Sequence, residues 1–423
     1  MDVLLDNVSI DLRKLLFEIA TALDAVGVDD IQHGYRVAYM AYQCSKRMGW
    51  EEELTQVSFA LGLIHDCGVS KPKERASLFA TLQPDNVQAH CNKGYQLLRV
   101  CPPLAELALP ILYHHTEWST LSNESQPSST DKKLASLIFI CDRVDFLYLG
   151  STLDQFGHLT SSDKNLIVNE LMESSGSLFE PGLVACMSEL IQCDDFWFSM
   201  QPEYIETMAS RFPSVPFFAA RMGLENSISV AELFAEIVDT KSPFTCQHSR
   251  KVARLSAFIG KKLGFSAKAQ RMLYLAGLVH DIGKLKTPSV VLHKPTDLTK
   301  QEYACIKRHA TDTRHTLMNI FQSSQIVEWA ANHHERLDGS GYPLGKSAND
   351  IDLPSRIIAI GDVFQALTQS RPYRQGLTIN EALQIIRALV EDGKLDQLVF
   401  DCLQENSQEC YFISTAEQAT ASA

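Results

Sequence analysis

The chain has 423 residues, of which 45% are hydrophobic and 21% are charged, so it can build two or three domains and is not disordered as a whole. Its formal net charge of -13, from 51 acidic and 38 basic residues, would repel a nucleic-acid backbone and argues against duplex nucleic acid as a partner. Its 11 cysteines are odd in number and include no CxxC pair, which is typical of reduced thiols in a cytosol rather than of a disulfide framework.

The N-terminal residues 1–20 mix charged with apolar side chains. Asp2 and Asp6 stand where a secretory signal would carry Lys or Arg. No stretch of the chain reaches the roughly 18 uncharged apolar residues that a membrane span requires. We therefore expect a cytoplasmic protein that does not cross a membrane.

Ten of the 13 histidines fall into two sets of five with nearly the same spacing, which indicates an internal repeat. The first interval is 32 residues in both sets, and the interval between the third and fourth histidines is 24 in both. The apolar pattern obeys the same shift, since Val37 and Met40 correspond to Val252 and Leu255. The two sets are His33, His65, His90, His114 and His115, and His248, His280, His309, His333 and His334.

Each copy begins with an amphipathic helix that follows its first histidine and ends at Gly49 or Gly264. A second helix ends in a His-Asp pair, at 65–66 and at 280–281. Strand patterns, in which Val, Ile and Thr alternate with polar residues between turns, are nearly absent. The sequence therefore predicts an all-α fold made of two tandem helical bundles.

Turn-rich and polar segments set the expected boundaries. The first bundle with its trailing helices is expected over 1–222, with a polar loop at 121–133. The segment 212–227 contains two Pro and a Gly and is the candidate linker. The second bundle is expected over 223–405, and the small and polar residues at 406–423 are expected to form a disordered tail.

The repeated histidines and aspartates favour metal binding. A lone histidine is usually a core residue with a local hydrogen bond, but seven ligand-type residues on a repeated template reverse that expectation. Imidazole and carboxylate ligands without thiolate suit Fe(II), Mn(II), Co(II) or Ni(II), and seven ligands with one bridging carboxylate are enough for two ions. Two ions about 3.5 to 4 Å apart can bind a phosphoryl oxygen and activate a bridging water, which is phosphodiester hydrolysis chemistry.

The second copy carries motifs that resemble a known family. HDIGK at 280–284 and HHERLDGSGYP at 333–343 resemble the signature motifs of HD-GYP proteins at every fixed position, and DVFQALTQSRPYR at 362–374 looks like that family's third block. The resemblance covers most of residues 240–390. It implies an all-helical, metal-dependent phosphodiesterase that opens a bacterial cyclic dinucleotide, c-di-GMP or 3′,3′-cGAMP, to a linear 5′-phosphorylated dinucleotide.

The resemblance also implies roles for single residues. Lys284 would stabilise charge at the scissile phosphate or protonate the leaving alkoxide, with His280 and Asp281 as the other catalytic residues. Arg371 and Arg374 would bind phosphate and base, a role that suits the guanidinium fork. One metal would be held by His248, His280, Asp281 and Asp362 and the other by His309, His333 and His334, with Asp281 as the bridge.

The loop at 338–343 would shape the site and contact a signalling protein, without binding metal. A homodimer is a further expected partnership. Two positions depart from the family pattern. Some relatives hold a third metal with a Glu four residues before the first histidine, but this position is Phe244, so we predict two metals. Gln365 stands where the family usually has an Asp whose charge would help tune the site.

The first copy keeps every ligand type and resembles the wider HD phosphohydrolase superfamily. Val69 stands where the second copy has Lys284, and nothing in the first copy matches DGxGYP or RPYR. Three interpretations remain open: a second active site similar to the superfamily's 5′-nucleotidases, an inactive metal-binding module that senses a ligand or supports dimerisation, and a bundle whose histidines are relics. The candidate ligands are His33, His65, Asp66, His90, His114, His115 and Asp142.

The alternative for the whole chain is a regulatory protein that binds a cyclic dinucleotide without cutting it. The intact ligand set of the second copy favours the enzyme. Cleavage of larger nucleic acids conflicts with the acidic charge of the chain.

Overall fold

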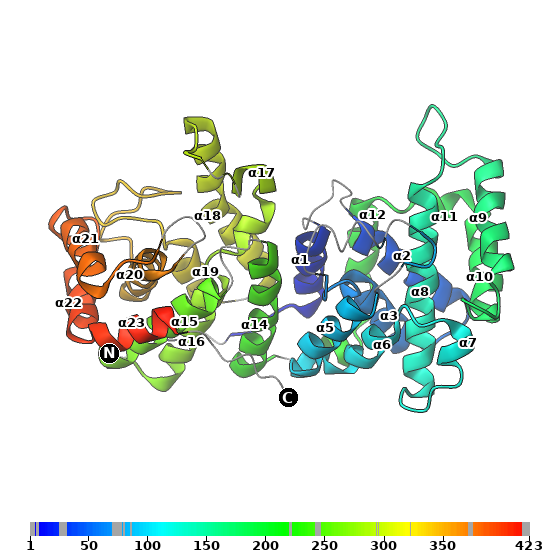
Figure 1. Ribbon diagram of the computed structural model, residues 1–423, viewed down its shortest axis with the longest axis horizontal. Helices are drawn as coiled ribbons and strands as arrows, with labels where there is room; N and C mark the ends of the chain where they lie inside the picture. The colour runs from blue at the N-terminus through cyan, green and yellow to red at the C-terminus, as the bar shows by residue number, and fades with distance from the viewer. Residues whose placement is uncertain are drawn as a thin grey trace. The chain divides into compact units, whose positions relative to one another are not determined.

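The computed structural model describes residues 5, 8–24, 32–69, 78, 81–84, 87–219, 222–241, 247–292, 294, 296–321, 323–370 and 375–416. Over these residues the chain forms helices joined by turns, with isolated β-bridges and no strand (Figure 1). The prediction of an all-α fold is confirmed. The chain divides into two compact units, one of Leu12–Ala220 and one of Met1–Asp11 with Arg221–Ala423.

The unit Leu12–Ala220 carries the first histidine set. Its core pairs α2 with α3, and α8 packs against both. A capping box between Ser128 and Asp131 starts α8. The helices are α1 (Leu12–Asp24), α2 (His33–Arg47), α3 (Glu52–Ile64), α5 (Gln88–Arg99), η1 (Pro102–Leu107), α6 (Ala108–Tyr113), α7 (Trp118–Leu121), α8 (Ser129–Leu149), α9 (Ser161–Glu173), α10 (Pro181–Ile191), α11 (Asp194–Phe198), α12 (Pro202–Ser210) and α13 (Pro216–Ala219).

The other unit carries the second histidine set and repeats this core. It pairs α15 with α16, and α20 packs against both. The helices are α14 (Leu224–Lys241), α15 (His248–Lys262), α16 (Ala267–Val279), η2 (Ile282–Lys286), α17 (Ser289–Leu292), α18 (Lys300–Ile320), α19 (Ser324–Ala331), α20 (Leu353–Thr368), α21 (Ile379–Glu391), α22 (Gln397–Glu405) and α23 (Ser407–Thr415).

A glycine lets the first two core helices of each unit approach closely. A Cβ on Gly62 would lie 2.5 Å from Ala38 Cα, and a Cβ on Gly277 would lie 2.6 Å from Ala253 Cα. Only glycine permits this backbone approach. The close crossing brings the histidine at the start of one helix next to the His-Asp pair at the end of the other.

The expected tail differs from the structure, whereas the candidate linker contains the division between the two compact units. Residues 407–415 of the expected disordered tail form α23, which buries Cys410 and Ser414. The Ser414 hydroxyl forms a hydrogen bond with the Thr368 hydroxyl of α20. Packing of these few buried groups outweighs the polar composition of the segment, and residues 417–423 lie outside the described residues. The candidate linker at 212–227 contains α13 and the start of α14.

The first residues also differ from expectation, because they belong to the unit of the second copy. Ile10 forms an isolated β-bridge with Phe321, and Asp11 N donates a hydrogen bond to Ile320 O at 2.9 Å. This pairing joins segments that lie far apart in the sequence. No local pattern predicts it.

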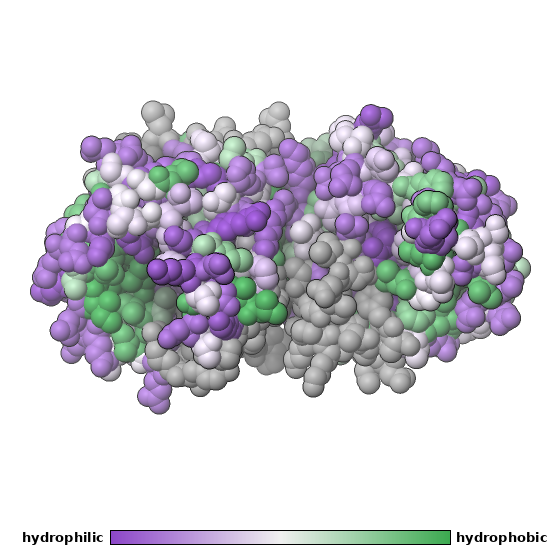
Figure 2. All heavy atoms as spheres, turned by 90° about the horizontal axis from the view of Figure 1, so that it is seen from above, coloured by the Kyte–Doolittle hydropathy of each residue, from purple (hydrophilic) through white to green (hydrophobic). Residues whose placement is uncertain are grey.

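Among the residues that the structure describes, no helix is long and apolar enough to cross a membrane. Figure 2 shows hydrophilic side chains interspersed with hydrophobic ones on the visible face of each unit. The described cysteines are free, and most of them are buried.

Candidate metal centres

Four of the seven predicted ligands in the second copy come together from three helices. His248 is the first residue of α15, His280 and Asp281 follow α16, and Asp362 lies on α20. His248 Nε2 lies 3.3 Å from Asp362 Oδ1, 3.4 Å from Asp281 Oδ2 and 3.3 Å from His280 Nε2. All four residues are buried.

The remaining three predicted ligands face the other oxygen of Asp281. His309 Nε2 lies 3.4 Å from Asp281 Oδ1 and 3.3 Å from His333 Nε2. His333 Nε2 lies 3.7 Å from the same oxygen, and a ring nitrogen of His334 is within 4.8 Å of those of its two neighbours. The structure thus brings all seven residues together, with the two oxygens of Asp281 directed to the two halves of the cluster.

The hydrogen bonds in this cluster leave a surplus of acceptors. Nδ1 of His309 and Nδ1 of His333 donate to Ile306 O at 2.6 Å and to Ala330 O at 2.7 Å, so Nε2 of each neutral ring carries a lone pair. Burial lowers the pKa of both imidazoles and keeps them neutral. Asp281 Oδ1 is buried and accepts no hydrogen bond from any described residue. Acceptors that face one another this closely need a cation, so the residues fit a divalent metal.

A strained glutamine precedes the first histidine of each set. Gln32 has φ of 102° and Gln247 has φ of 71°, and both lie in the left-handed region that favours glycine. Such strain often accompanies a functional site. Its presence in both copies supports the view that each first histidine is held in a required orientation.

His248 differs in charge from His309, His333 and His334, whose pKa values are lowered mainly by burial. Burial would lower the pKa of His248, but hydrogen bonds to Asp281 and Asp362 raise it to about 10. His33 in the first copy behaves alike, since Asp142 and Asp145 raise its pKa to about 10 against the effect of burial. At neutral pH each ring is therefore an imidazolium, and a metal held through Nε2 would displace the proton of that nitrogen.

We expect metal binding to release protons and to strengthen as the pH rises. While His248 is protonated, the affinity for Mn(II) should increase by about tenfold per pH unit for each proton displaced, up to the pKa of that ring at about 10. Isothermal titration calorimetry in two buffers of different ionisation enthalpy measures the protons released. Equal heats in both buffers would contradict this expectation.

Two residues after Asp281, the chain packs tightly on α18. Gly283 N donates to Thr313 Oγ1 at 2.9 Å, and that hydroxyl donates to His280 O at 3.1 Å. A Cβ on Gly283 would lie only 2.0 Å from His309 O. This contact fixes the position of Asp281 relative to His309. The sequence repeat identified the glycine, whereas Thr313 carried no signal.

Lys284 lies beside the bridging carboxylate. Its Nζ is 2.5 Å from Asp281 Oδ2, and its side chain is 23% exposed. The ammonium is therefore within reach both of the cluster and of a molecule that enters from solvent. Three other residues that the sequence singled out, Arg371, Arg374 and Phe244, lie outside the described residues.

The loop at 338–343 closes one side of the second cluster. The ring of Tyr342 lies 4.7 Å from the ring of His334. Glu335 is 2% exposed and accepts hydrogen bonds from Leu344 N at 2.8 Å and Lys346 N at 2.9 Å. Sequence reasoning gave this loop a shaping role but did not single out Glu335, which holds the loop in place.

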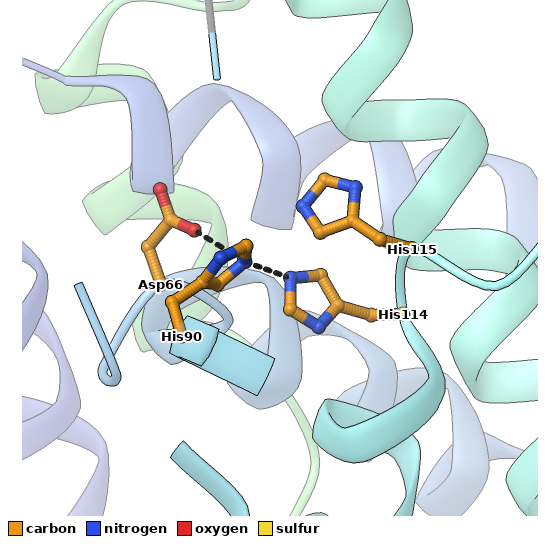
Figure 3. A group of neighbouring side chains, drawn as sticks. All are labelled: Asp66, His90, His114 and His115. Atoms are coloured by element: carbon orange, nitrogen blue, oxygen red, sulfur yellow. Dashed lines mark hydrogen bonds and ion pairs between the residues drawn. The ribbon is translucent and has the colours of Figure 1, made fainter. Parts of the chain in front are cut away.

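The histidine set of the first copy forms a buried cluster of its own, called the first cluster, and that of the second copy is the second cluster. His90 Nε2 lies 3.4 Å from His114 Nε2 and 3.9 Å from Asp66 Oδ1, and His115 completes the group (Figure 3). An adjoining group contains His33, His65 and Asp66. Asp142 lies 3.3 Å from His33 Nε2 through Oδ1 and 3.6 Å from His115 Nε2 through Oδ2. All seven candidate ligands of the first copy are therefore neighbours.

A buried arginine distinguishes the first cluster from the second. Arg143 is 1% exposed, and its guanidinium donates to Asp142 Oδ2 at 2.7 Å and to the carbonyl oxygens of Leu78 and Thr81 at 3.0 and 3.1 Å. Burial would raise the pKa of Asp142, but Arg143 and the neighbouring histidines hold it well below its usual value. The second copy has Val363 at this place. Sequence reasoning missed Arg143, whose only signal is its position next to Asp142.

Comparisons with known proteins identify relatives of this chain. A family model described as an HD domain matches residues 232–399. The 3′3′-cGAMP-specific phosphodiesterase 1 of Vibrio cholerae is 52% identical over 412 residues, which cover 97% of this chain and 95% of the relative. A cyclic di-GMP phosphodiesterase of Pseudomonas aeruginosa is 37% identical over 163 residues, which cover 38% of this chain and 39% of the relative. The crystal structure of a cyclic GMP-AMP specific phosphodiesterase of V. cholerae shares the fold, with a TM-score of 0.62 at 21% identity over 95% of this chain and 98% of that chain.

Proposed function

The chain belongs to the HD-GYP family of metal-dependent cyclic dinucleotide phosphodiesterases, and from this premise we propose that its second bundle hydrolyses 3′,3′-cGAMP. The match to the V. cholerae 3′3′-cGAMP-specific enzyme, which extends over both units, supports this substrate over c-di-GMP. The product would be the linear 5′-phosphorylated dinucleotide. We place the reaction in the bacterial cytoplasm, which suits the free thiols of the described cysteines.

The observation that carries the proposal is the surplus of buried acceptors around Asp281. A pair of divalent ions of the Fe, Mn, Co or Ni class would supply Lewis acidity and an activated water there. Asp281 would bridge the two ligand groups, and Lys284 would stabilise or protonate the leaving oxygen from its place beside Oδ2. Arg371 and Arg374 would bind the substrate's phosphate and base.

The test is a product analysis with both substrates. Purified protein loaded with Mn(II) or Fe(II) is incubated with 3′,3′-cGAMP or c-di-GMP, and the products are separated by chromatography. The proposal requires that 3′,3′-cGAMP is consumed faster. Binding of both compounds without cleavage by metal-loaded protein would instead support the regulatory alternative.

We further propose that the first bundle removes the 5′-phosphate that ring opening leaves. The convergence of its ligands supports a metal site, whereas Val69, which stands where a charged residue is usual in the superfamily's nucleotidases, argues against full catalysis. An inactive metal-binding module is the alternative.

Matched substitutions separate these two readings of the first bundle. We expect His65→Ala to accumulate the 5′-phosphorylated dinucleotide, because the ring opening by the second bundle continues while dephosphorylation stops. His280→Ala should leave 3′,3′-cGAMP uncut but still dephosphorylate a supplied linear 5′-phosphorylated dinucleotide. Chromatography of timed samples measures both. If His65→Ala gives the same products at the same rates as the unaltered protein, the nucleotidase proposal is wrong.

The loop at 338–343 is our proposed contact for a signalling protein. Asp338, Ser340 and the adjacent Leu344 are exposed, and Leu344 presents 60% of its surface. Because Tyr342 packs on His334, a partner that moved this loop would also reach the second cluster. A homodimer remains a further proposal for the chain.

A further inference from the structure

The two clusters differ in the residue that lies behind their first histidine. In the first bundle, His33 Nδ1 lies 2.7 Å from Asp145 Oδ2. Asp145 is fully buried and also accepts hydrogen bonds from Arg36, from Nε at 2.5 Å and from Nη2 at 2.9 Å. In the second bundle the corresponding residue is Gln365, whose Oε1 accepts the hydrogen bond from His248 Nδ1. One histidine therefore faces a charged acceptor and the other a neutral one.

Gln365 is an unfavourable residue for this place if packing alone is considered. Its side chain is fully buried, and its Nε2 donates no hydrogen bond to any residue that the structure describes. A buried amide donor without an acceptor loses its hydration and gains nothing in return. A carboxylate would accept the same hydrogen bond and leave no donor unsatisfied. What Gln365 offers instead is an acceptor without charge.

The charge behind a metal-binding histidine affects the metal. A carboxylate that accepts the Nδ1 proton makes the opposite nitrogen a stronger ligand, and changing such a partner typically alters metal affinity by about 10- to 100-fold. It also adds a negative charge close to the site. The second cluster already contains Asp281 and Asp362, and under the proposed function it must admit an anionic phosphodiester.

We propose that Gln365 is a positioning residue that orients His248 without adding a negative charge. Compared with a carboxylate at this position, Gln365 makes the second bundle bind metal less tightly and repel an anionic substrate less strongly. Asp145 has the opposite effect in the first bundle, where Arg36 balances its charge. The substrate part of this inference rests on the proposed function, whereas the metal part does not.

Two isosteric substitutions test the proposal in the full chain. Gln365→Glu places a charged carboxylate behind His248, and Asp145→Asn removes the charge behind His33 together with one of the oxygens that accept hydrogen bonds from Arg36 and His33. The Mn(II) affinity of each variant is measured in a chain whose other cluster is disabled. The chain with Gln365→Glu also carries Asp66→Ala, and the chain with Asp145→Asn also carries Asp281→Ala. Competition with a chelator for Mn(II), followed by electron paramagnetic resonance of free Mn(II), gives the affinities. We expect Gln365→Glu to tighten binding by about tenfold or more and Asp145→Asn to weaken it similarly.

The kinetics give a second readout. Gln365→Glu should raise KM for the cyclic dinucleotide more than it lowers kcat, because an added charge opposes substrate binding. Gln365→Met, which has similar volume but no acceptor, should weaken Mn(II) binding and so exclude a purely space-filling role. If Gln365→Glu is folded by circular dichroism but binds Mn(II) no more tightly, or if Asp145→Asn binds it unchanged, the proposal is overturned. Tighter Mn(II) binding by a chain that cleaves neither dinucleotide would support this inference and overturn the proposed function.

Discussion

Asp281→Ala is expected to lower kcat/KM for the cyclic dinucleotide by about 1000-fold or more, because one residue serves both halves of the second cluster. Its Oδ2 faces His248 and His280, and its Oδ1 faces His309 and His333. Removing the carboxylate takes the shared ligand from both halves and leaves Lys284 without its ion pair. Turnover assays and elemental analysis of the purified protein measure the two effects.

The control for this substitution is Asp401→Ala, which removes an exposed carboxylate on α22 of the same unit. Its turnover and metal content should match those of the unaltered protein. A chain with Asp281→Ala that binds the dinucleotide but does not cut it fits the enzyme reading. Turnover within tenfold of the unaltered protein would show that Asp281 does not bridge a catalytic metal pair.

Gly283→Ala is expected to destabilise the second unit and to abolish its activity. The added Cβ would lie 2.0 Å from His309 O and 2.4 Å from Thr313 N, and these are backbone atoms that cannot rotate away. Separating η2 from α18 should cost about 1–3 kcal/mol or more and move Asp281 away from His309. Thermal denaturation followed by circular dichroism and the turnover assay measure both consequences.

Gly223→Ala is the matched control, because a Cβ at Gly223 would meet no atom within 4 Å. Its melting temperature should stay close to that of the unaltered protein. An equal melting temperature for Gly283→Ala would mean that the contact between η2 and α18 is looser than the structure indicates. The same substitution at Gly68 tests the first bundle, since a Cβ there would lie 1.9 Å from His90 O.

The repeat made much of the fold and of both clusters predictable. Histidines at equal intervals and glycines two residues after each His-Asp pair placed corresponding side chains on corresponding helix ends, and the structure brings these side chains together. Periodicity and helix-ending signals are local, so a single sequence carries them.

Features that depend on contacts between distant segments were not predictable. The bridge between Ile10 and Phe321 and the burial of Ser414 against Thr368 join residues with no shared local pattern. Nothing in the sequence distinguishes Arg143 from an ordinary exposed arginine, whereas in the structure its guanidinium donates hydrogen bonds to Asp142 and to two backbone carbonyl oxygens. Gln365 was noticed as a departure, but only the structure shows that its amide nitrogen is buried without an acceptor among the described residues.

The spread of the ligands along the chain has a consequence for folding. In the second bundle the ligands come from α15, α18 and α20 and from the residues that follow α16 and α19. Ions held there would cross-link segments from position 248 to position 362. The free energy of metal binding at such a cross-link also stabilises the folded bundle. A bundle stabilised in this way would need its metal ligands for folding even if it had no catalytic activity. The full ligand set of the first bundle would therefore suit a metal that stabilises the fold as well as one that takes part in catalysis.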